Sequence, residues 1–271
     1  MGALNVSPES FYPGSVHIDV DALLEAAQTM VEAGAVLIDV GARSTAPYLP
    51  TAIDEEEEVK RLSRAIGALA AKLDVPISAD TAGARPARAA LGAGARVVND
   101  VSGLVDPELA RLVGEAGVGL IAMASPGDGE AGATGPLATV AACLRRSLRR
   151  AHAAGIADER IVLDPGIGFF RDGPIPWVDW DVAILAQLED LLELGRPLCV
   201  AVSRKSFIGA VTGRDTPSDR LAGSLAATAL AVAHGASLIR THDVRETIDA
   251  VRVAGRIREA VLHRDGEARG S

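Results

Sequence analysis

Residues 76–100 read PISADTAGARPARAALGAGARVVND, and this stretch decides the fold. An apolar run ending in Asp80 is followed by a helical segment and then by a second apolar run ending in Asn99-Asp100. A short continuous apolar run is typical of a strand buried on both faces, and parallel strands joined by helices are its usual source. The stretch therefore predicts a strand–helix–strand unit.

The same unit repeats along the 271 residues of the chain. Strands are expected at 1–6, 36–40, 76–80, 95–100, 119–123, 160–164, 198–203 and 237–241. Helices are expected at 19–34, 54–73, 85–94, 107–116, 137–155, 179–195, 218–235 and 244–262. Eight such units predict an α/β protein, a single-domain (β/α)8 TIM barrel, which typically needs about 250 residues. The barrel is expected to span 1–262, followed by a polar C-terminal tail at 263–271.

Composition narrows the classes of function. A net charge of −9 argues against nucleic-acid binding, which requires a basic surface. No apolar stretch reaches the roughly 18 residues of a membrane span, so no membrane partner is expected. The two cysteines, Cys143 and Cys199, fall on apolar positions and are expected to be buried and unpaired. A cytoplasmic location is the default that follows.

Polar side chains stand where the expected strands end. Asp80, Asn99 and Asp164 occupy three such ends, and a barrel brings all its strand carboxyl ends to one face. A carboxylate accepts two N–H bonds in a fork and an amide both donates and accepts, so the three suit a nitrogen-rich ring such as a 2-amino-4-oxo pyrimidine. Any one aspartate alone is more often the cap of the following turn; three convergent strand ends favour a shared site.

Two basic segments follow the last two strands. Residues 203–206 read Ser-Arg-Lys-Ser and offer backbone N–H groups at a helix start together with the cation of Lys205. Alternation along the strand puts Arg240 and His242 on one side, which suits clamping a diphosphate. The alternatives are a basic surface loop at 203–206 and an isolated core histidine at 242. A few cations focused in one cleft act locally despite the negative net charge.

Several other motifs do not indicate a functional site. The run Asp54-Glu55-Glu56-Glu57-Glu58 is expected to be a solvated first helical turn rather than a metal-binding cluster. Gly166-Ile167-Gly168 lacks the third glycine and the position of a dinucleotide fingerprint. The sequence has no Gly-x-Ser-x-Gly elbow, and no Cys–His quartet for a structural zinc. Long loops at 7–19, 125–136 and 165–178 all follow strand carboxyl ends, where lids and substrate clamps are usual.

Taken together, these motifs resemble the dihydropteroate synthase family, the pterin-binding barrel enzymes of folate biosynthesis. The matching stretches run in family order at 5–11, 44–45, 78–81, 98–103, 164–169, 203–207 and 240–244. The resemblance implies condensation of (7,8-dihydropterin-6-yl)methyl diphosphate with 4-aminobenzoate, giving 7,8-dihydropteroate and pyrophosphate. It also implies a homodimer.

The resemblance assigns roles residue by residue. The residues implied to hold the pterin are Asp80, Asn99, Asp164 and Lys205, of which Asp80, Asp164 and Lys205 are the catalytic candidates. The residues implied to hold the diphosphate are Asn5, Arg240 and His242, with a Mg²⁺ cofactor near Asn5. The remaining substrate-binding candidates are Thr45, Phe169 and Ser203 at the aminobenzoate pocket, with Met123, Arg204 and Arg43.

The chain departs from the family pattern at the second substrate. Residues 41–47 read GARSTAP where the family usually has Gly-Gly-Glu-Ser-Thr-Arg-Pro, so an arginine stands before Thr45 instead of after it. Met123-Ala124-Ser125 replaces a more usual Met-His-Met, and Phe170-Arg171 replaces Gly-Lys. These variants resemble an archaeal-like branch, in which the aromatic amine can differ from free 4-aminobenzoate.

Two rival functions stay open at this point. A methyltransferase domain that uses methyltetrahydrofolate shares the barrel and the pterin pocket, although it would have little use for Arg240 and His242 as a diphosphate clamp. The other rival is a pterin-binding paralogue without catalysis, which the altered segment at 41–47 suggests. Release of pyrophosphate separates this paralogue from an active synthase.

Overall fold

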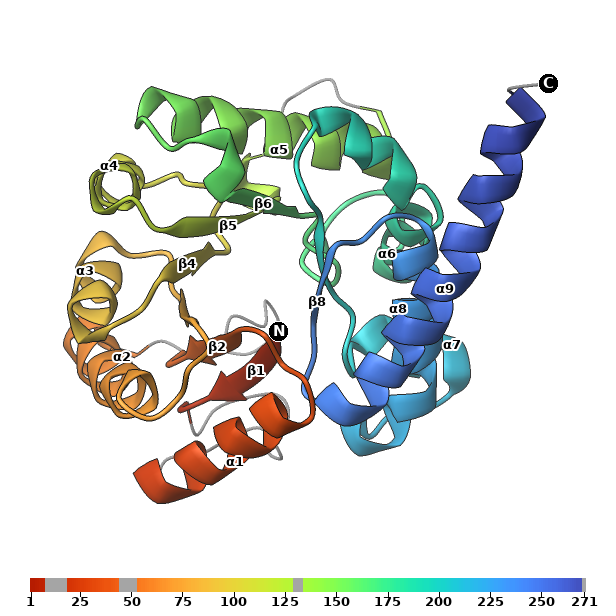
Figure 1. Ribbon diagram of the computed structural model, residues 1–271. Helices are drawn as coiled ribbons and strands as arrows, with labels where there is room; N and C mark the ends of the chain where they lie inside the picture. The colour runs from red at the N-terminus through yellow and green to blue at the C-terminus, as the bar shows by residue number, and fades with distance from the viewer. Residues whose placement is uncertain (8–18, 44–52, 129–133, 270–271) are drawn as a thin grey trace.

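The strands form where the apolar runs predict them. A computed structural model describes residues 1–7, 19–43, 53–128 and 134–269 of the chain (Figure 1). Its strands are β1 (Gly2–Asn5), β2 (Ile38–Gly41), β3 (Ile77–Asp80), β4 (Val97–Asp100), β5 (Gly119–Met123), β6 (Ile161–Asp164), β7 (Cys199–Ala201) and β8 (Leu238–Arg240). Each lies within or at the edge of an expected run, and all the pairings between them are parallel.

The strands close into a barrel. β1 to β6 pair in sequence order as one sheet, and β7 pairs with β8. Isolated bridges between Leu163 and Leu198 and between Gly2 and Thr241 join the two sheets at both edges. Two backbone hydrogen bonds close the barrel between β1 and the end of β8. Ala3 N–H donates to Thr241 C=O at 2.9 Å, and Thr241 N–H donates to Met1 C=O at 3.0 Å. The (β/α)8 expectation is thereby confirmed.

Helices surround the strands on the outside (Figure 1). They are α1 (Val20–Glu32), α2 (Glu55–Ala70), α3 (Ala84–Ala93), α4 (Pro107–Ala116), α5 (Pro136–Ala153), α6 (Trp177–Ala186), α7 (Ser206–Thr212), α8 (Leu221–Ala233) and α9 (Val244–Arg269). Short 3-10 helices lie at Pro126–Asp128, Asp158–Arg160, Leu188–Leu194 and Pro217–Arg220. Aspartates 19, 54 and 106 cap α1, α2 and α4 by accepting backbone N–H bonds, which satisfies groups that a helix start leaves open.

Three helical segments differ from the expectation. The predicted helix 179–195 divides into α6 and a 3-10 turn, and α7 forms as an extra short helix directly after β7. The last helix continues to Arg269 instead of ending at 262, so the polar segment from 263 extends α9 rather than forming a separate tail. The end of α9 projects past the barrel in Figure 1. A helical segment that does not pack against the barrel needs no apolar face, so the apolar pattern in the sequence does not show where such a helix ends.

Side chains alternate between the barrel interior and the helix layer along every strand. The interior contains a small apolar cluster, whose members are Met1, Leu37, Ile121 and Cys199. Two residues after Leu37, β2 carries the buried Asp39. β1, β3 and β6 end in the polar residues Asn5, Asp80 and Asp164, so polar side chains gather where the strands lead into the following loops.

Candidate active site

A row of four residues crosses the mouth of the barrel. Asn5 is in register with Gly41, Gly41 with Asp80, and Asp80 with Asn99. Gly41 leaves room between its neighbours, because a Cβ at this position would lie 3.2 Å from Asn5 Oδ1 and 3.5 Å from Asp80 Oδ2. The sequence prediction that Asp80 and Asn99 lie side by side at one face is confirmed by this register.

A buried ion network stands beside this row. Arg240 reaches across the barrel from β8, donating from Nη2 to Asp80 Oδ2 at 3.0 Å and from Nε to Asp39 Oδ2 at 2.7 Å. Asn99 Nδ2 donates to the same Asp39 oxygen at 3.2 Å. Asp39 is fully buried and was absent from the candidates. Its signal was a charged residue inside the otherwise apolar run 36–40.

The carboxyl group of Asp80 is poised to change its protonation. Burial is the main cause that raises its pKa to about 7, Asp39 adds to the rise, and the cations of Arg240 and Arg43 oppose it. Within the described residues, Asp80 Oδ1 and Asp39 Oδ1 are buried and have no hydrogen-bond partner. An oxygen of this kind is costly to bury unless a ligand satisfies it. Arg43, two residues after the end of β2, therefore acts electrostatically on the carboxylate of Asp80.

Glu58 corrects the interpretation of the acidic run. Residues 54–57 begin α2 at the surface as expected, and Asp54 caps the helix. Glu58, however, is buried, and its Oε1 accepts the hydroxyl of Thr81 at 2.5 Å. The helix period turns every fourth residue back to the barrel, so the last acid of the run belongs to the layer behind Asp80.

A second set of site residues lies on the opposite side of the mouth. Asp164 ends β6 beside Met123 of β5, with which it is in register. Its Oδ1 accepts the N–H of Gly166 at 2.7 Å, and burial raises the pKa of its carboxyl group while Lys205 lowers it. Asp164 thus combines the two roles that the sequence left as alternatives, because it caps its own turn and faces the interior.

Lys205 lies over this turn. Its Nζ donates to the carbonyl of Ile167 and stands 4.8 Å from the ring centroid of Phe169. Burial lowers the pKa of the ammonium to about 8, against the opposing charges of Asp164 and Asp181. An ammonium has three donors, so Lys205 keeps further donors for a ligand. Asp181 of α6, which sequence reasoning did not select, is buried and accepts the N–H of Gly168 at 2.8 Å.

Ser203 and His242 form a pair at the ends of β7 and β8. The hydroxyl of Ser203 lies 3.0 Å from His242 Nδ1 and accepts the backbone N–H of His242 at 3.2 Å. Burial and the cations of Arg240 and Arg204 lower the pKa of the imidazole to about 3. His242 is therefore neutral near pH 7 and can offer hydrogen bonds to an anion, but no charge.

Arg204, one of the substrate-binding candidates, forms its side-chain contacts within the protein. Its guanidinium is buried and forms a fork with Asp243, with Nη2 to Oδ1 at 2.5 Å and Nε to Oδ2 at 2.8 Å, and it also donates to the carbonyls of Pro217 and Ser218. These bonds tie β7, β8 and the turn before α8 together. We assign Arg204 a structural role, because the bonds engage its guanidinium within the protein.

Asp100 and Thr45 are not placed in the described site, for different reasons. Asp100, which follows Asn99, turns away from the interior: its carboxylate accepts Ser102 N–H at 3.0 Å and Leu104 N–H at 2.5 Å. Asp100 therefore caps the turn that follows it, which is the usual role of an aspartate at the end of a strand. Thr45 lies outside the described residues, so its place at the second-substrate pocket stays a prediction.

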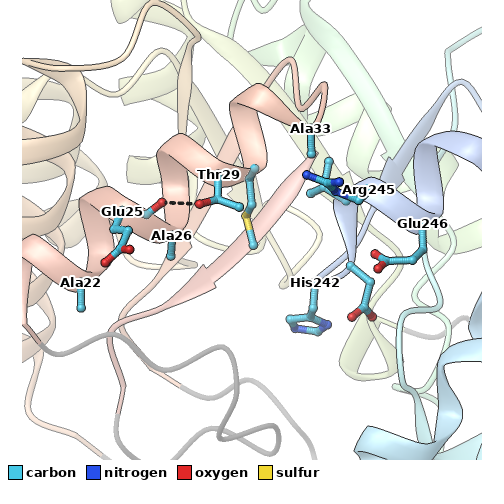
Figure 2. Close-up of a pocket in the computed structure, with 11 residues that line it drawn as sticks. Ala22, Glu25, Ala26, Thr29, Ala33, His242, Arg245 and Glu246 are labelled. Atoms are coloured by element: carbon cyan, nitrogen blue, oxygen red, sulfur yellow. Dashed lines mark hydrogen bonds between the residues drawn. The ribbon is translucent and has the colours of Figure 1, made fainter.

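A surface pocket borders the site on the outer side of β8 (Figure 2). The start of α1, with Ala22, Glu25 and Ala26, faces His242 and the first turn of α9 across it. Arg245 and Glu246 line the same pocket from α9. Its lining contains neither Asp80 nor Asn99, so it is not the pocket for the nitrogen-rich ring.

Asn5 is the residue at the end of β1 that would contribute a protein oxygen to a magnesium ion. Among the described residues, no group of three histidine, cysteine or acidic side chains could bind a metal. Asn5 ends β1 with an amide oxygen, a hard donor of the kind that Mg²⁺ accepts. Mg²⁺ commonly uses one or two protein oxygens with phosphate oxygens and water, so this donor set is compatible with it.

Membrane attachment through a helix has no counterpart in the described part of the chain, where each helix is too short or too polar to span a bilayer. Cys143 and Cys199 are both buried, and no disulfide joins them.

Comparison with known proteins places the site in a family. The family model described as "Pterin binding enzyme" matches residues 1–242. The dihydropteroate synthase of Escherichia coli K12 is 36% identical over 258 residues, covering 93% of this chain and 89% of that protein. The dihydropteroate synthase of Coxiella burnetii, solved with pteroic acid, superposes with a TM-score of 0.85 at 35% identity, covering 96% of this chain and 93% of that one.

A further solved relative carries the second ligand. The dihydropteroate synthase of Xanthomonas albilineans, solved with 4-aminobenzoic acid, superposes with a TM-score of 0.85 at 39% identity, covering 95% of this chain and 92% of that one. These three relatives are bacterial, and the expected affinity to an archaeal-like branch is not confirmed.

Proposed function

This chain belongs to the dihydropteroate synthase family of pterin-binding enzymes, and from that premise we propose that the residues described above carry the family's reaction. The reaction joins (7,8-dihydropterin-6-yl)methyl diphosphate to 4-aminobenzoate, giving 7,8-dihydropteroate and pyrophosphate. The observation that carries the proposal is the convergence of Asp80, Asn99, Asp164 and Lys205 inside one barrel mouth, with Arg240 and His242 beside them.

The pterin occupies the interior between the two carboxylates. Asp80 and Asp164 stand on opposite sides of the mouth and accept N–H bonds, while Asn99 both donates and accepts at the ring edge. Asp80 Oδ1, buried without a partner among the described residues, supplies an acceptor for this purpose. Lys205, already over Phe169, donates to the ring from the side of Asp164.

The diphosphate lies toward β1 and β8. Arg240 supplies the cation and His242 a neutral imidazole, and Asn5 would hold Mg²⁺ through its amide oxygen. Mg²⁺, when bound, offsets the charge that develops on the diphosphate. Arg240 is now bound to Asp39 and Asp80, so moving toward the diphosphate would free Asp80 to accept the pterin. Substrate binding thereby exchanges one set of partners for another.

The chemistry needs no enzyme nucleophile. The bond between the pterin methylene carbon and the diphosphate oxygen breaks, and its electron pair leaves with the diphosphate. The cation that remains is conjugated with the pterin ring, where the carboxylates of Asp80 and Asp164 stabilise it. The amine nitrogen of 4-aminobenzoate then attacks the methylene carbon and releases a proton, which the diphosphate or water accepts. Exclusion of other water from the cation is the remaining task of the protein.

The 4-aminobenzoate pocket lies beside Phe169 and Ser203. Thr45 borders it in the proposal, together with Met123 at the end of β5 and Arg43 at the end of β2. Arg43 stands close enough to Asp80 to affect its pKa, so a cation is present on this side of the mouth. A carboxylate-bearing amine suits such a position.

Assembly and location complete the proposal. We propose a homodimer that works in the cytoplasm. Both cysteines are buried and no disulfide joins them, which agrees with a reducing compartment. Light scattering on the purified chain tests the dimer, and a monomer at micromolar concentration would contradict it.

Pyrophosphate release tests the function. Purified protein is given Mg²⁺ and dihydropterin-methyl diphosphate, with and without 4-aminobenzoate. Release that depends on the amine supports the synthase, whereas pterin binding without release indicates the non-catalytic paralogue. Lys205→Met should lower kcat/KM by at least tenfold because the ring loses its donor. Lys72→Met, an exposed lysine after α2, is the matched control and should behave as the wild type.

A further inference from the structure

One buried carboxylate near the site has no role in the reaction described above. Asp181 lies on α6 with 1% of its surface exposed. Its Oδ1 accepts the backbone N–H of Gly168 at 2.8 Å, and its Oδ2 is buried without a hydrogen-bond partner among the described residues. Burial raises the pKa of this carboxyl group, and the Gly168 N–H and the cations of Lys205 and Arg171 oppose the rise.

The two bonds at this turn belong to one peptide group. The N–H of Gly168 donates to Asp181, and the C=O of Ile167, which is the other half of the same peptide, accepts Lys205 Nζ. In a trans peptide these two groups point in opposite directions. The carboxylate of Asp181 and the ammonium of Lys205 therefore stand at the two ends of one peptide unit, connected through it.

The geometry of Gly168 permits this arrangement. Its φ is +85°, a conformation that favours glycine, and a Cβ here would lie 3.1 Å from Lys205 Cδ. The next residue, Phe169, carries the ring beneath the ammonium. Arg171 holds the other side of Gly168 by donating from Nε to its carbonyl at 3.1 Å. The turn is thus fixed at both of its polar groups.

We propose that Asp181 is a positioning residue for Lys205: its carboxylate fixes the Ile167–Gly168 peptide, whose carbonyl oxygen anchors the ammonium in the pterin subsite. The proposal rests on the proposed function, in which Lys205 donates to the pterin. A hydrogen bond to the N–H end of a peptide polarises it and strengthens the bond at its C=O end. Asp181 thereby acts on the ammonium without touching the ligand.

The negative charge of Asp181 also favours the ammonium form of Lys205, in addition to the contact through the peptide. Four charged groups face Lys205: Asp164 from β6, Asp181 from α6, Arg240 from β8 and Arg171 from the connection before α6. Burial and the two arginines favour the neutral amine, and the two aspartates favour the ammonium. Because Asp164 also serves the ligand, Asp181 is the aspartate dedicated to holding Lys205.

Two variants separate position from charge. Asp181→Asn keeps an oxygen that can accept the Gly168 N–H but removes the charge, and Asp181→Leu removes both. Asp179→Asn makes the same chemical change at an exposed position of the same helix and serves as the control. Circular dichroism and thermal melting establish that each variant folds, and Asp181→Asn carries the test if Asp181→Leu does not.

The readout is the affinity for an unphosphorylated pterin, measured by calorimetry from pH 6 to pH 9.5. Affinity should fall on the alkaline side as Lys205 loses its proton, and this fall should begin at lower pH in Asp181→Asn by about one pH unit. Asp181→Leu should bind the pterin at least tenfold more weakly at pH 7. The pterin's own titration is common to all variants and cancels in the comparison.

The outcomes are distinct for the two proposals. Wild-type pterin affinity in a folded Asp181→Leu, together with an unmoved alkaline limb in Asp181→Asn, would overturn the positioning role while leaving the proposed function intact. If Asp181→Leu does not fold, an unmoved alkaline limb and wild-type affinity in Asp181→Asn overturn it, because an amide oxygen is the weaker acceptor for the Gly168 N–H. A wild-type protein that binds no pterin at any pH would overturn the proposed function, and the role of Asp181 with it.

Discussion

Asp80 and Asp39 share one guanidinium inside the barrel, and this shared contact sets the behaviour of single residues at the site. Two buried carboxylates beside one cation leave a net negative charge in a region of low dielectric, which favours protonation of one of them. Burial is the larger cause and the charge of Asp39 the second cause of the raised pKa of Asp80. The site therefore holds an acceptor whose charge a ligand with N–H donors can stabilise.

Substitution of Asp80 tests the acceptor directly. Asp80→Asn should weaken pterin binding about 10- to 100-fold, because an amide cannot accept both N–H bonds of a fork and a charged hydrogen bond contributes about 1.5–3 kcal/mol. Calorimetry with an unphosphorylated pterin measures the effect. Asp74→Asn, at an exposed position before β3, is the control. Equal affinities in the two variants would remove Asp80 from the pterin subsite.

The pH dependence of pterin binding follows from the same group. The carboxylate form accepts the N–H bonds, so binding requires that the proton be lost, and the pKa of Asp80 is raised to about 7. Affinity should then fall by up to about tenfold for each pH unit below 7, and should level off above 7 until Lys205 begins to lose its proton near pH 8. Titrations between pH 5.5 and 7.5 measure this slope. A slope that persists in Asp80→Asn would assign it to another group.

At the scale of elements, Arg240 connects strands that are far apart in the chain. It joins β8 to β2 and β3 through Asp39 and Asp80, across the interior of the barrel. Arg240→Lys should lower the free energy of unfolding by about 1–3 kcal/mol, because one ammonium cannot reproduce the fork and a buried acceptor loses its partner. Chemical denaturation measures this loss. Unchanged stability would mean that the network is not formed.

The same substitution should also affect the substrates unequally. Arg240→Lys should raise the KM for the pterin diphosphate more than it raises the Kd of the unphosphorylated pterin, since the arginine serves the diphosphate. Equal changes for both ligands would contradict the assignment of the diphosphate to β8.

The close approach of α4 and α5 gives a packing prediction. A Cβ on Gly114 of α4 would lie 2.1 Å from the backbone carbonyl oxygen of Ala154, so Gly114→Ala must push the two helices apart. We expect a loss of about 1–3 kcal/mol in the free energy of unfolding, from denaturant titration. Gly67→Ala on α2 meets no atom within 4 Å and should instead stabilise by roughly 0.5–1 kcal/mol. The prediction fails if both variants shift stability in the same direction.

At the scale of the whole molecule, the site has two ends served by different strands. In the proposed function, Asp80, Asn99, Asp164 and Lys205 hold the pterin, whereas Asn5, Arg240 and His242 serve the diphosphate. Because His242 is neutral, Arg240 is the cation among these three described residues, and a metal ion would supply further positive charge. The two ends should therefore respond separately to removal of the metal.

Chelation of Mg²⁺ tests this separation. It should weaken binding of dihydropterin-methyl diphosphate by at least tenfold and stop pyrophosphate release, while the Kd of the unphosphorylated pterin stays within about twofold. Calorimetry with and without chelator measures both constants, and restoring Mg²⁺ in excess is the control. Loss of both affinities together would indicate that the metal supports the fold or the pterin subsite.

The sequence by itself determined the barrel and the position of its active face. Each apolar run and the helix after it are local patterns, and eight of them in succession leave few alternatives to a closed parallel barrel. Once the strands are assigned, their carboxyl ends are known to carry residues such as Asp80, Asn99 and Asp164. The register then placed them as expected.

Only the tertiary structure decided which charged groups pair inside the barrel. Arg240 and Asp39 are 201 residues apart in the chain and meet because the barrel closes between β8 and β1. The fork between Arg204 and Asp243 and the bond from the Gly168 N–H to Asp181 are likewise contacts that form only in the folded chain. The partner of a side chain depends on distances across the fold, which hydrophobic periodicity along the chain does not contain.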